Sequence, residues 1–352
     1  MKKMLKPIES NFYMPAEWTP HECCWMQWPH KNLNFSGYEA VPSWSHFDFE
    51  KGMIAWAKVA KAIANFEKVK MIVHPKDIEY AKKLLDGEIE IIKFTNDDAW
   101  ARDSGAIFLL NKNGKLGGVD WEFNGWGKFK PYDSDNKIAK FMIEHSSAAY
   151  FKNNMVLEGG SVHVDGQGTL ITTRQCLLNK NRNPNLSISE IEENLKDYLG
   201  VKKIIWLNKG TDQGTDGHVD NIACFAKPGT VIALSCSDKK DPYYNQINEN
   251  LEILKTSTDF GGKKLNIIEL EMSYKRLIPE DDEPSSYINF YIANNGIVMP
   301  VFGDEKADEN AKKIIEKVFH NRKIITIDGI DILMGGGNVH CITQQQPLSI
   351  SS

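Results

Sequence analysis

A recurring order of secondary-structure elements constrains this fold more than any other feature of the sequence. Apolar side chains recur every three or four positions over residues 48–66, which predicts an amphipathic helix, and a strand-like run follows it directly. A hairpin is expected soon afterwards, with its turn at Asn113-Gly114. In chain order, the first copy reads helix 48–66, strand 69–73, helix 77–85, strand 88–94 and hairpin arms 105–110 and 117–123.

The same order returns twice. A helix over 187–199 carries a capping box made by Ser187 and Glu190, and Gly200 is its stop signal. The predicted elements after it are strand 203–207, hairpin 219–235 turning at Lys227-Pro228-Gly229, helix 307–319, strand 323–327 and the glycine-rich C-terminal segment. Visible copies lie roughly 70 to 110 residues apart, so some copies are expected to be hidden or interrupted.

One internal match is sharper than the rest. Residues 156–164 align with 332–341 if one inserted glycine is allowed, and both read as an apolar strand end, a glycine turn and an alternating strand. Duplication and chance both remain open as explanations. Because no linker or low-complexity stretch separates the units, we expect one closed domain over residues 1–352.

Composition narrows the class of protein. The chain has 352 residues, 41% hydrophobic and 25% charged, as is typical of soluble globular proteins. The 47 acidic and 42 basic residues form no block of five like charges, so neither a nucleic-acid arm nor an acidic tail is expected. No apolar run approaches the roughly 20 residues of a membrane span, and none follows the basic start as a secretion signal requires. Six cysteines without a CxxC pair predict thiols in a reducing cytoplasm.

Cys341 is the best candidate for a nucleophile. The three glycines at 335–337 let the backbone before it approach a ligand closely. The plainer interpretation is a small buried apolar residue, which is what most free cysteines are. The other five cysteines lack this setting and are expected to pack in the core.

His218 and Asp220 are candidates for acid–base chemistry. Two residues apart in a strand, they would point to the same face and line one pocket. A structural histidine explains the pattern equally well, and His163-Val164-Asp165 has the same spacing at an expected hairpin turn. Two such pairs also raise a zinc or iron site, but no third pair and no HExxH motif completes it.

Asp103 and Glu158 are acids at strand–turn junctions, where most acids are solvated caps. Several carboxylates and one histidine beside a thiol would suit a planar cation, because carboxylates meet a guanidinium through two hydrogen bonds. Trp100 and Trp126 could bind an alkylammonium against their ring faces by cation–π contact, although large aromatic residues more often belong to the core. Asp97 lies in the same acidic segment as Asp103 and is a further candidate for substrate binding.

At these segments the chain resembles the agmatine deiminases of the guanidine-modifying, peptidyl-arginine deiminase-like superfamily. The longest matching segment is GGGNVHCITQQQP at 335–347. The others are 14–18, 100–105, 158–161, 179–184, 215–221 and 289–291. The resemblance therefore extends along nearly the whole chain.

The resemblance implies a five-bladed α/β-propeller (pentein) of ββαβ units with pseudo-fivefold symmetry. It places the thiol nucleophile on Cys341 and the catalytic histidine on His218. The catalytic acids fall on Asp103, Glu158 and Asp220, and Trp100 falls in the substrate pocket. The family needs neither a metal nor an organic cofactor.

The chain departs from the family pattern in two places. Lysines occupy 128 and 130 where a more neutral run is expected, and Asp212-Gln213-Gly214 is less acidic than usual. Both departures leave the chemistry intact and bear on how the distal end of the substrate is recognised.

The expected reaction is hydrolysis of agmatine to N-carbamoylputrescine and ammonia through a thiouronium adduct on Cys341, in putrescine and polyamine biosynthesis. Asp103 and Asp220 would clamp the guanidinium, and Glu158 would orient His218. The runner-up is a deiminase of free or peptidyl arginine; an amidinotransferase, a metallohydrolase and a guanidine sensor are more distant alternatives. The expected partner is the small cation, with no nucleic acid and no membrane, and assembly into a homo-oligomer is left open.

Overall fold

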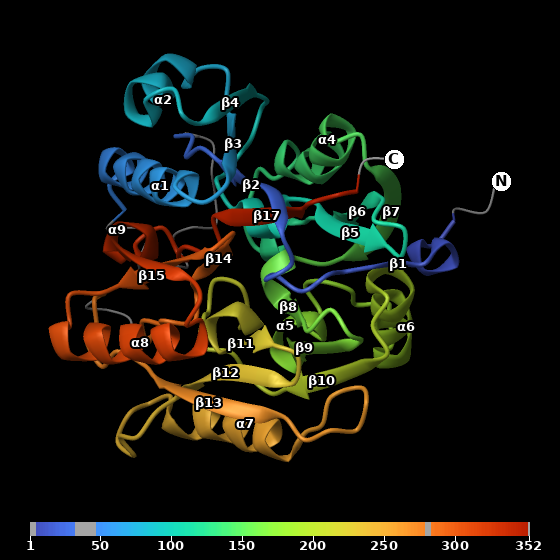
Figure 1. Cartoon of the computed structure of the whole chain (residues 1–352), viewed down its shortest axis with the longest axis vertical. Helices are drawn as coiled ribbons and strands as arrows, with labels where there is room; N and C mark the ends of the chain where they lie inside the picture. The colour runs from blue at the N-terminus through green and yellow to red at the C-terminus, as the bar shows by residue number, and fades with distance from the viewer. Residues whose placement is uncertain (1–4, 32–46, 279–282, 351–352) are drawn as a thin grey trace.

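The structure is a computed structural model that describes residues 5–31, 47–278 and 283–350. The first four residues of the N-terminal segment and the last two of the chain lie outside it. Within the described part the strands form five sheets. In Figure 1 the colour passes from blue at the top through green on the right and yellow at the bottom to red on the left. The sheets therefore follow one another around the molecule in nearly the order of the sequence.

The sheets share one pattern of pairing. Two have four strands: β1 (Phe12–Tyr13), β5 (Ile107–Asn111), β6 (Leu116–Glu122) and β7 (Ala149–Val156); and β17 (Thr343–Pro347), β2 (His21–Gln27), β3 (Lys68–Val73) and β4 (Glu90–Lys93). Three have three strands: β10 (Lys203–Leu207), β9 (Thr169–Thr173) and β8 (Val162–Val164); β11 (Ala223–Lys227), β12 (Thr230–Ser235) and β13 (Asn266–Glu271); and β14 (Tyr291–Ala293), β15 (Gly296–Val301) and β16 (Lys323–Asp328). Each contains an antiparallel pair whose second strand pairs in parallel with a third.

A helix precedes the third strand of each sheet, as a parallel connection requires. These helices are α4 (Ile138–His145), α6 (Ile188–Leu199), α7 (Tyr244–Thr256), α8 (Glu305–Val318) and α1 (Phe49–Ala64). The remaining α-helices are α2 (Ile78–Leu85), α3 (Ala101–Ser104), α5 (Arg174–Leu177) and α9 (Ile330–Leu333). The order strand, strand, helix, strand is thus the repeated unit of the chain.

The local signals read from the sequence mostly fall where they were predicted. Asp48 caps α1, and the capping box of Ser187 and Glu190 begins α6. Gly200 ends α6 with φ 67°, a left-handed conformation that glycine adopts at little cost. The hairpins β5–β6 and β11–β12 turn at the predicted sites.

The copies hidden from sequence analysis are those with weak local patterns or distant partners. The segment that holds α7 and β13 was not predicted, nor were the short β14 and its partner β15. The last copy is completed only when β17, near the C-terminus, pairs with β2, near the N-terminus.

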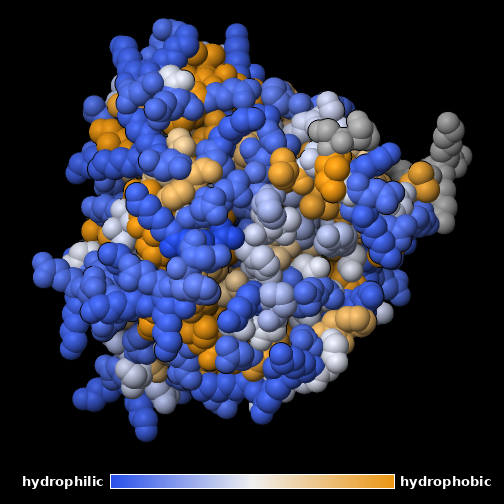
Figure 2. All heavy atoms as spheres, viewed as in Figure 1, coloured by the Kyte–Doolittle hydropathy of each residue, from blue (hydrophilic) through white to orange (hydrophobic). Residues whose placement is uncertain are grey.

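Helices lie outside the sheets and bury one face against them. In α1 the buried positions include Ala55, Trp56, Val59 and Ile63, whereas lysines lie on the other side. Figure 2 shows the outcome on one face of the molecule: the protruding side chains are mostly hydrophilic, and hydrophobic ones lie recessed between them. Among the described helices, none combines the length and apolar character needed to cross a bilayer.

One short segment precedes the first strand of each antiparallel pair. These segments are α3 before β5, the 3-10 turn Gly159–Ser161 before β8, the 3-10 turn Val219–Asn221 before β11, residues 285–290 before β14, and residues 334–342 before β17. The strand expected to hold His218 and Asp220 was therefore wrong: His218 caps a 3-10 turn, and the strand begins only at Ala223. These segments carry the candidate active site.

Candidate active site

Cys341 lines a cavity together with Trp100, Asp103 and Trp126. Its side chain is almost fully buried, with 6% of the residue exposed. Glycine is required beside it, because a Cβ on Gly337 would lie 2.6 Å from the Trp100 ring and 3.2 Å from Cys341 Sγ. The glycine run predicted to admit a ligand thus leaves the sulfur open to the cavity.

Asn289 holds the thiol in place. Its Nδ2 lies 3.2 Å from Cys341 Sγ, and its Oδ1 accepts hydrogen bonds from the backbone N–H groups of His340 (3.0 Å) and Cys341 (3.3 Å). Burial raises the pKa of the Cys341 thiol well above its usual value, and the carboxylates of Asp220 and Asp103 raise it further. Without a bound cation the sulfur therefore keeps its proton at neutral pH.

His218 is completely buried, and neither ring nitrogen has a hydrogen-bond partner. Its Nδ1 lies 3.7 Å from Asp103 Oδ1, and its Nε2 lies 3.9 Å from Glu158 Oε2. Burial alone would lower the pKa of His218, but Asp103, Cys176 and Glu158 hold it well above the usual value. The resting ring is consequently an imidazolium with both N–H groups available.

Gly160 marks the point where the site residues converge. A Cβ there would lie 2.6 Å from His218 Nδ1 and 2.9 Å from both Asp103 Oδ1 and Asp220 Oδ2. Asp220 Oδ2 in turn lies 3.6 Å from Cys341 Sγ. Residues 103, 158, 218, 220 and 341, which are far apart in sequence, therefore gather around one small volume.

Asp103 is fixed by its neighbours. Its Oδ2 accepts from Trp126 Nε1 at 2.9 Å, and its Oδ1 accepts from the Gly160 N–H at 3.0 Å. Burial raises the pKa of Asp103 to about 6, with Asp220 and Glu158 acting in the same direction against His218. A cation placed beside it would lower this pKa and favour the charged form further.

Asp220 belongs to a buried network beneath the thiol. Its Oδ2 accepts from His340 Nδ1 at 2.9 Å, and His340 Nε2 donates to Glu17 Oε1 at 2.8 Å. Burial would raise the pKa of Asp220, but His340, His218 and Arg102 bring it below the usual value. Asp220 Oδ1 has no partner and is left for a ligand.

The two tryptophans and Asp97 have different surroundings. Trp100 packs edge-on against Trp56, and Trp126 packs between Phe123 and Phe129; both tryptophans line the cavity. Asp97 is not among the lining residues.

The Asp97 carboxylate supports a loop. Its Oδ2 accepts from the backbone N–H groups of Ser134 (2.7 Å) and Asp135 (3.4 Å). The predicted role of Asp97 in substrate binding stays a prediction.

Four residues around the site were missed as functional candidates: Glu17, Arg182, Asn289 and His340. Each lies in a segment that carries the resemblance, but nothing in the local pattern distinguished it from a structural polar residue. Three of them act on other side chains of the site, and Asn289 contacts the thiol itself. Only their positions in the folded structure therefore mark these four residues as functional candidates.

The two departures from the family pattern meet in space. Lys128 Nζ donates to the carbonyl oxygens of Gln213 (2.6 Å) and Gly214 (3.3 Å), and it lies 2.7 Å from Asp216 Oδ1. The lysine thus caps the segment before His218.

Some side chains are close enough to share a metal ion. Three groups have ligand atoms within 4.8 Å of one another: Glu17-His163-His340, His30-His74-Asp77 and Glu158-Cys176-His218. In the third, Glu158 Oε1 already accepts from Arg182 Nε at 2.5 Å. The expectation of catalysis without a metal or cofactor stays a prediction. As expected, Asp165 closes a hairpin turn, accepting from the N–H groups of Gln167 and Thr169.

Comparison with known proteins identifies the class. Residues 13–347 match the family model described as Porphyromonas-type peptidyl-arginine deiminase. Since this match covers nearly the whole chain, the chain belongs to that family, as the sequence motifs predicted.

Individual relatives narrow the identification. An agmatine deiminase of Pseudomonas aeruginosa (strain LESB58) is 41% identical, covering 97% of each chain, and one of Medicago truncatula is 38% identical, covering 97% of this chain and 98% of its own. A solved structure described as the agmatine deiminase of Enterococcus faecalis catalyzing its reaction superimposes with a TM-score of 0.89, at 35% identity over 98% of both chains. The predicted mixed α/β fold is thereby confirmed. The DDAH of Pseudomonas aeruginosa shares the fold alone, with a TM-score of 0.50 at 12% identity over 93% of this chain and 99% of that one.

Proposed function

We propose that this chain hydrolyses agmatine to N-carbamoylputrescine and ammonia, with Cys341 as the nucleophile. The observation that carries the proposal is the convergence of His218, Asp103 and Asp220 around Gly160, with Asp220 reaching the thiol. The names of the Pseudomonas aeruginosa and Medicago truncatula relatives support agmatine as the substrate.

The guanidinium is bound by carboxylates. Asp103 and Asp220 each offer an oxygen near Gly160, and Asp220 Oδ1 is still unpaired. A carboxylate about 4 Å from a cation gains roughly 4 kcal/mol at an effective dielectric near 20, before the cost of desolvation. Trp100 and Trp126 would flank the alkyl chain.

Substrate binding activates the nucleophile. Because burial and carboxylates raise the pKa of Cys341, the sulfur is a thiol in the resting enzyme. The bound guanidinium places a positive charge beside it and lowers that pKa, so the thiol proton passes to solvent as the substrate settles. Activation then depends on the correct ligand.

The reaction proceeds in two halves. The thiolate attacks the guanidinium carbon to form a C–S bond, the His218 imidazolium gives its proton to the departing nitrogen, and the C–N bond breaks to release ammonia. Neutral His218 then takes a proton from water, whose oxygen attacks the thiouronium carbon. The C–S bond then breaks as the remaining hydroxyl proton passes to the sulfur, which leaves the ureido product and regenerates the Cys341 thiol.

The lining of the cavity favours agmatine over arginine. Among its described residues it holds the carboxylates of Asp103, Asp212 and Glu283 but no lysine and no arginine. The α-carboxylate of arginine would therefore meet like charge, whereas the distal ammonium of agmatine meets opposite charge. A free or peptidyl arginine substrate remains the alternative to be tested.

We also infer that the five sheets are the blades of a five-bladed α/β-propeller and that residues 1–352 form one catalytic domain. The repeated strand, strand, helix, strand order supports the blades, and the pairing of β17 with β2 supports a closed ring. Six free thiols suit a reducing compartment, so we place the reaction in the cytoplasm.

A substrate panel tests the proposal. Ammonia release should be fastest from agmatine and much slower from arginine and a peptidyl arginine, and mass spectrometry of the quenched protein should find the adduct on Cys341. Faster ammonia release from arginine than from agmatine would make arginine the substrate in place of agmatine. Ammonia release from a Cys341→Ala variant would end the covalent scheme.

A further inference from the structure

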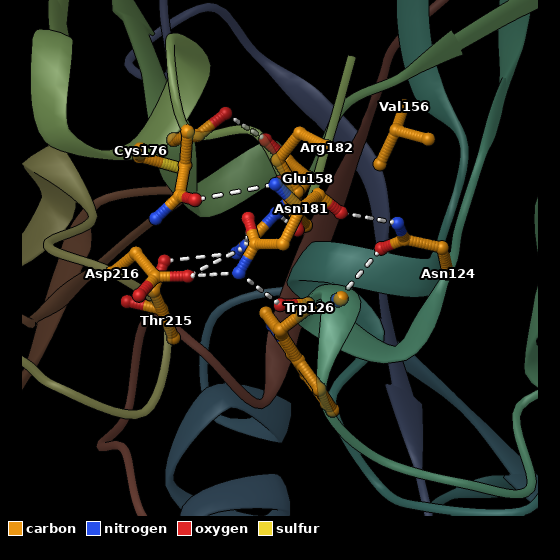
Figure 3. A network of polar contacts seen from close by, with 12 residues as sticks. Asn124, Trp126, Val156, Glu158, Cys176, Asn181, Arg182, Thr215 and Asp216 are labelled. Atoms are coloured by element: carbon orange, nitrogen blue, oxygen red, sulfur yellow. Dashed lines mark hydrogen bonds and ion pairs between the residues drawn. The ribbon is translucent and has the colours of Figure 1, made fainter. Parts of the chain in front are cut away.

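Arg182 is a buried guanidinium just behind the catalytic histidine. The residue is 4% exposed and does not line the substrate cavity. Its Nε donates to Glu158 Oε1 at 2.5 Å, one terminal nitrogen donates to Asp216 Oδ2 at 2.7 Å, and the other donates to the Thr215 carbonyl at 2.9 Å. Figure 3 shows these bonds converging on the fork of the side chain.

This contact decides how Glu158 can act. Arg182 occupies Oε1 alone, while Oε2 has no hydrogen-bond partner and lies 3.9 Å from His218 Nε2. Among the described residues Arg182 is the one charged hydrogen-bond donor to this carboxylate, and without it Glu158 could turn both oxygens toward the imidazolium. Arg182 thereby keeps the Glu158 carboxylate near His218 but prevents it from moving within hydrogen-bond distance of the ring.

The same arginine steadies the segment before His218. Thr215, whose carbonyl accepts from Arg182, also accepts the His218 backbone N–H on its Oγ1 at 3.1 Å. The neighbouring Asn181 donates to Asp216 Oδ2 at 2.9 Å.

Asn181 also connects to the segment that carries Trp126. Its carbonyl accepts from Asn124 Nδ2 at 2.9 Å, as Figure 3 shows. Residues 181 and 182 therefore tie together the segments of Trp126, Glu158 and His218.

We propose that Arg182 is a positioning residue for the water-activating half of the reaction, acting through Glu158 and the Thr215–Asp216 turn on His218. The inference rests on the proposed deiminase function and deepens it. Arg182 contacts no substrate and acts on the second half of the reaction, so its loss should lower kcat while kcat/KM, which reports binding and the first half, changes little.

The two halves of the reaction need opposite states of His218. The acid step uses the imidazolium, whereas water activation uses the neutral ring. Five side chains act electrostatically on His218. Four are the carboxyl groups of Asp103, Glu158, Asp212 and Asp220, and the fifth is the thiol of Cys176. Removing the positive charge of Arg182 would strengthen the hold of these carboxylates on the proton. After ammonia leaves, the ring would then be protonated again from solvent, and little of it would be the neutral base that water activation needs, so the adduct should form but hydrolyse slowly.

The experiment compares Arg182→Ala and Arg182→Lys with the wild type and with Arg322→Ala, which removes another part-buried arginine that donates to backbone carbonyls. For Arg182→Ala we expect kcat to fall roughly a hundredfold, kcat/KM to change less than about threefold because KM falls with kcat, and the Cys341 adduct to accumulate at steady state. Arg182→Lys keeps the charge without the fork and should lie between. The Arg322→Ala control should keep wild-type kcat and show no added adduct.

Chemical rescue separates positioning from folding. The space vacated in Arg182→Ala is lined by Glu158, Asp216 and the Thr215 carbonyl, which together form a guanidinium site. Millimolar guanidinium chloride should raise the kcat of this variant at least about tenfold, whereas sodium chloride and urea should not. In the wild type, guanidinium should only inhibit.

Several results would overturn the inference. The first is a kcat of Arg182→Ala within about threefold of the wild-type value. The second is a wild-type kcat of Arg182→Lys without accumulated adduct. The third is a loss of kcat in Arg182→Ala that comes with neither accumulated adduct nor rescue by guanidinium. If Arg182→Ala fails to fold, the kcat and adduct level of Arg182→Lys decide. A wild-type protein that releases no ammonia from agmatine would count against the proposed function itself.

Discussion

The two sides of the active site are built from similar parts but handle charge differently. On the nucleophile side, Cys341 is a neutral thiol next to Asp220, whose charge is already shared with His340. On the acid–base side, His218 is held as an imidazolium near Glu158, whose charge is shared with Arg182. In the proposed mechanism the thiol must wait for the cation of the substrate, whereas the imidazolium is ready beforehand. The proposal thereby couples substrate binding to activation of the thiol through electrostatics.

Removing the sulfur should have the largest effect and tests the nucleophile side directly. Cys341→Ala should lower kcat by roughly 10⁴-fold or more, since no covalent adduct can form. Agmatine should still bind, because Asp103 and Asp220 remain, and calorimetry would measure this. Loss of binding together with turnover would show instead that the sulfur helps to hold the cation.

Removing the imidazole tests the other side. His218→Gln should lower kcat by roughly 10²–10⁴-fold, the usual contribution of a general acid–base. If His218 is the acid of the first half, quenched samples of this variant should carry little adduct, in contrast to Arg182→Ala. Abundant adduct in both variants would remove the distinction between the two halves.

A methyl group at Gly160 tests whether the two sides share one volume. Gly160→Ala would place a carbon 2.6 Å from His218 Nδ1 and 2.9 Å from both Asp103 Oδ1 and Asp220 Oδ2, so kcat/KM should fall about 10- to 100-fold. Gly261→Ala is the matched control, because a Cβ there meets only the Asp259 side chain at 3.3 Å and no site residue. Equal activities for the two variants would mean that the site has room the structure does not show.

The smallest expected effect is on pH dependence. The pKa of Asp103 is raised to about 6, so in the free enzyme its carboxylate is protonated below that pH and cannot clamp the cation. The acid limb of the kcat/KM profile should therefore lie near pH 6, and kcat/KM should fall about tenfold between pH 7 and pH 5. An acid limb near pH 4 would mean that the Asp103 carboxyl has an ordinary pKa, and it would count against the proposal that protonation of Asp103 abolishes binding of the guanidinium.

Much of the local structure could be predicted from the sequence. The helices with clear apolar periodicity and caps, such as α1 and α6, were predicted to within a few residues, as were strands β3 and β10. The argument from a shared strand face for His218 and Asp220 failed, because the chain turns through Val219–Asn221 before the strand begins. Both residues nevertheless reach the site, since a tight turn can bring nearby side chains together as well as a strand can.

The residues that support the site could not be singled out. Arg182, His340 and Asn289 owe their importance to partners at 158, 220 and 341, and only folding brings these pairs within hydrogen-bond distance. A polar residue that supports a catalytic one has no local signature, because its chemistry is that of any buried hydrogen bond. Asp97 illustrates the reverse case, an acid in a promising segment whose carboxylate accepts from backbone N–H groups of a loop.

The sequence by itself determined the helices, the glycine turns and the identity of the reactive groups, because periodicity, capping and side-chain chemistry act over a few residues. Tertiary structure decided which of those groups meet. The strand near the C-terminus pairs with one near the N-terminus, and each sheet delivers one short segment to the same place. The pKa values that define the resting enzyme follow from that meeting, since burial and neighbouring charge exist only once the chain has folded.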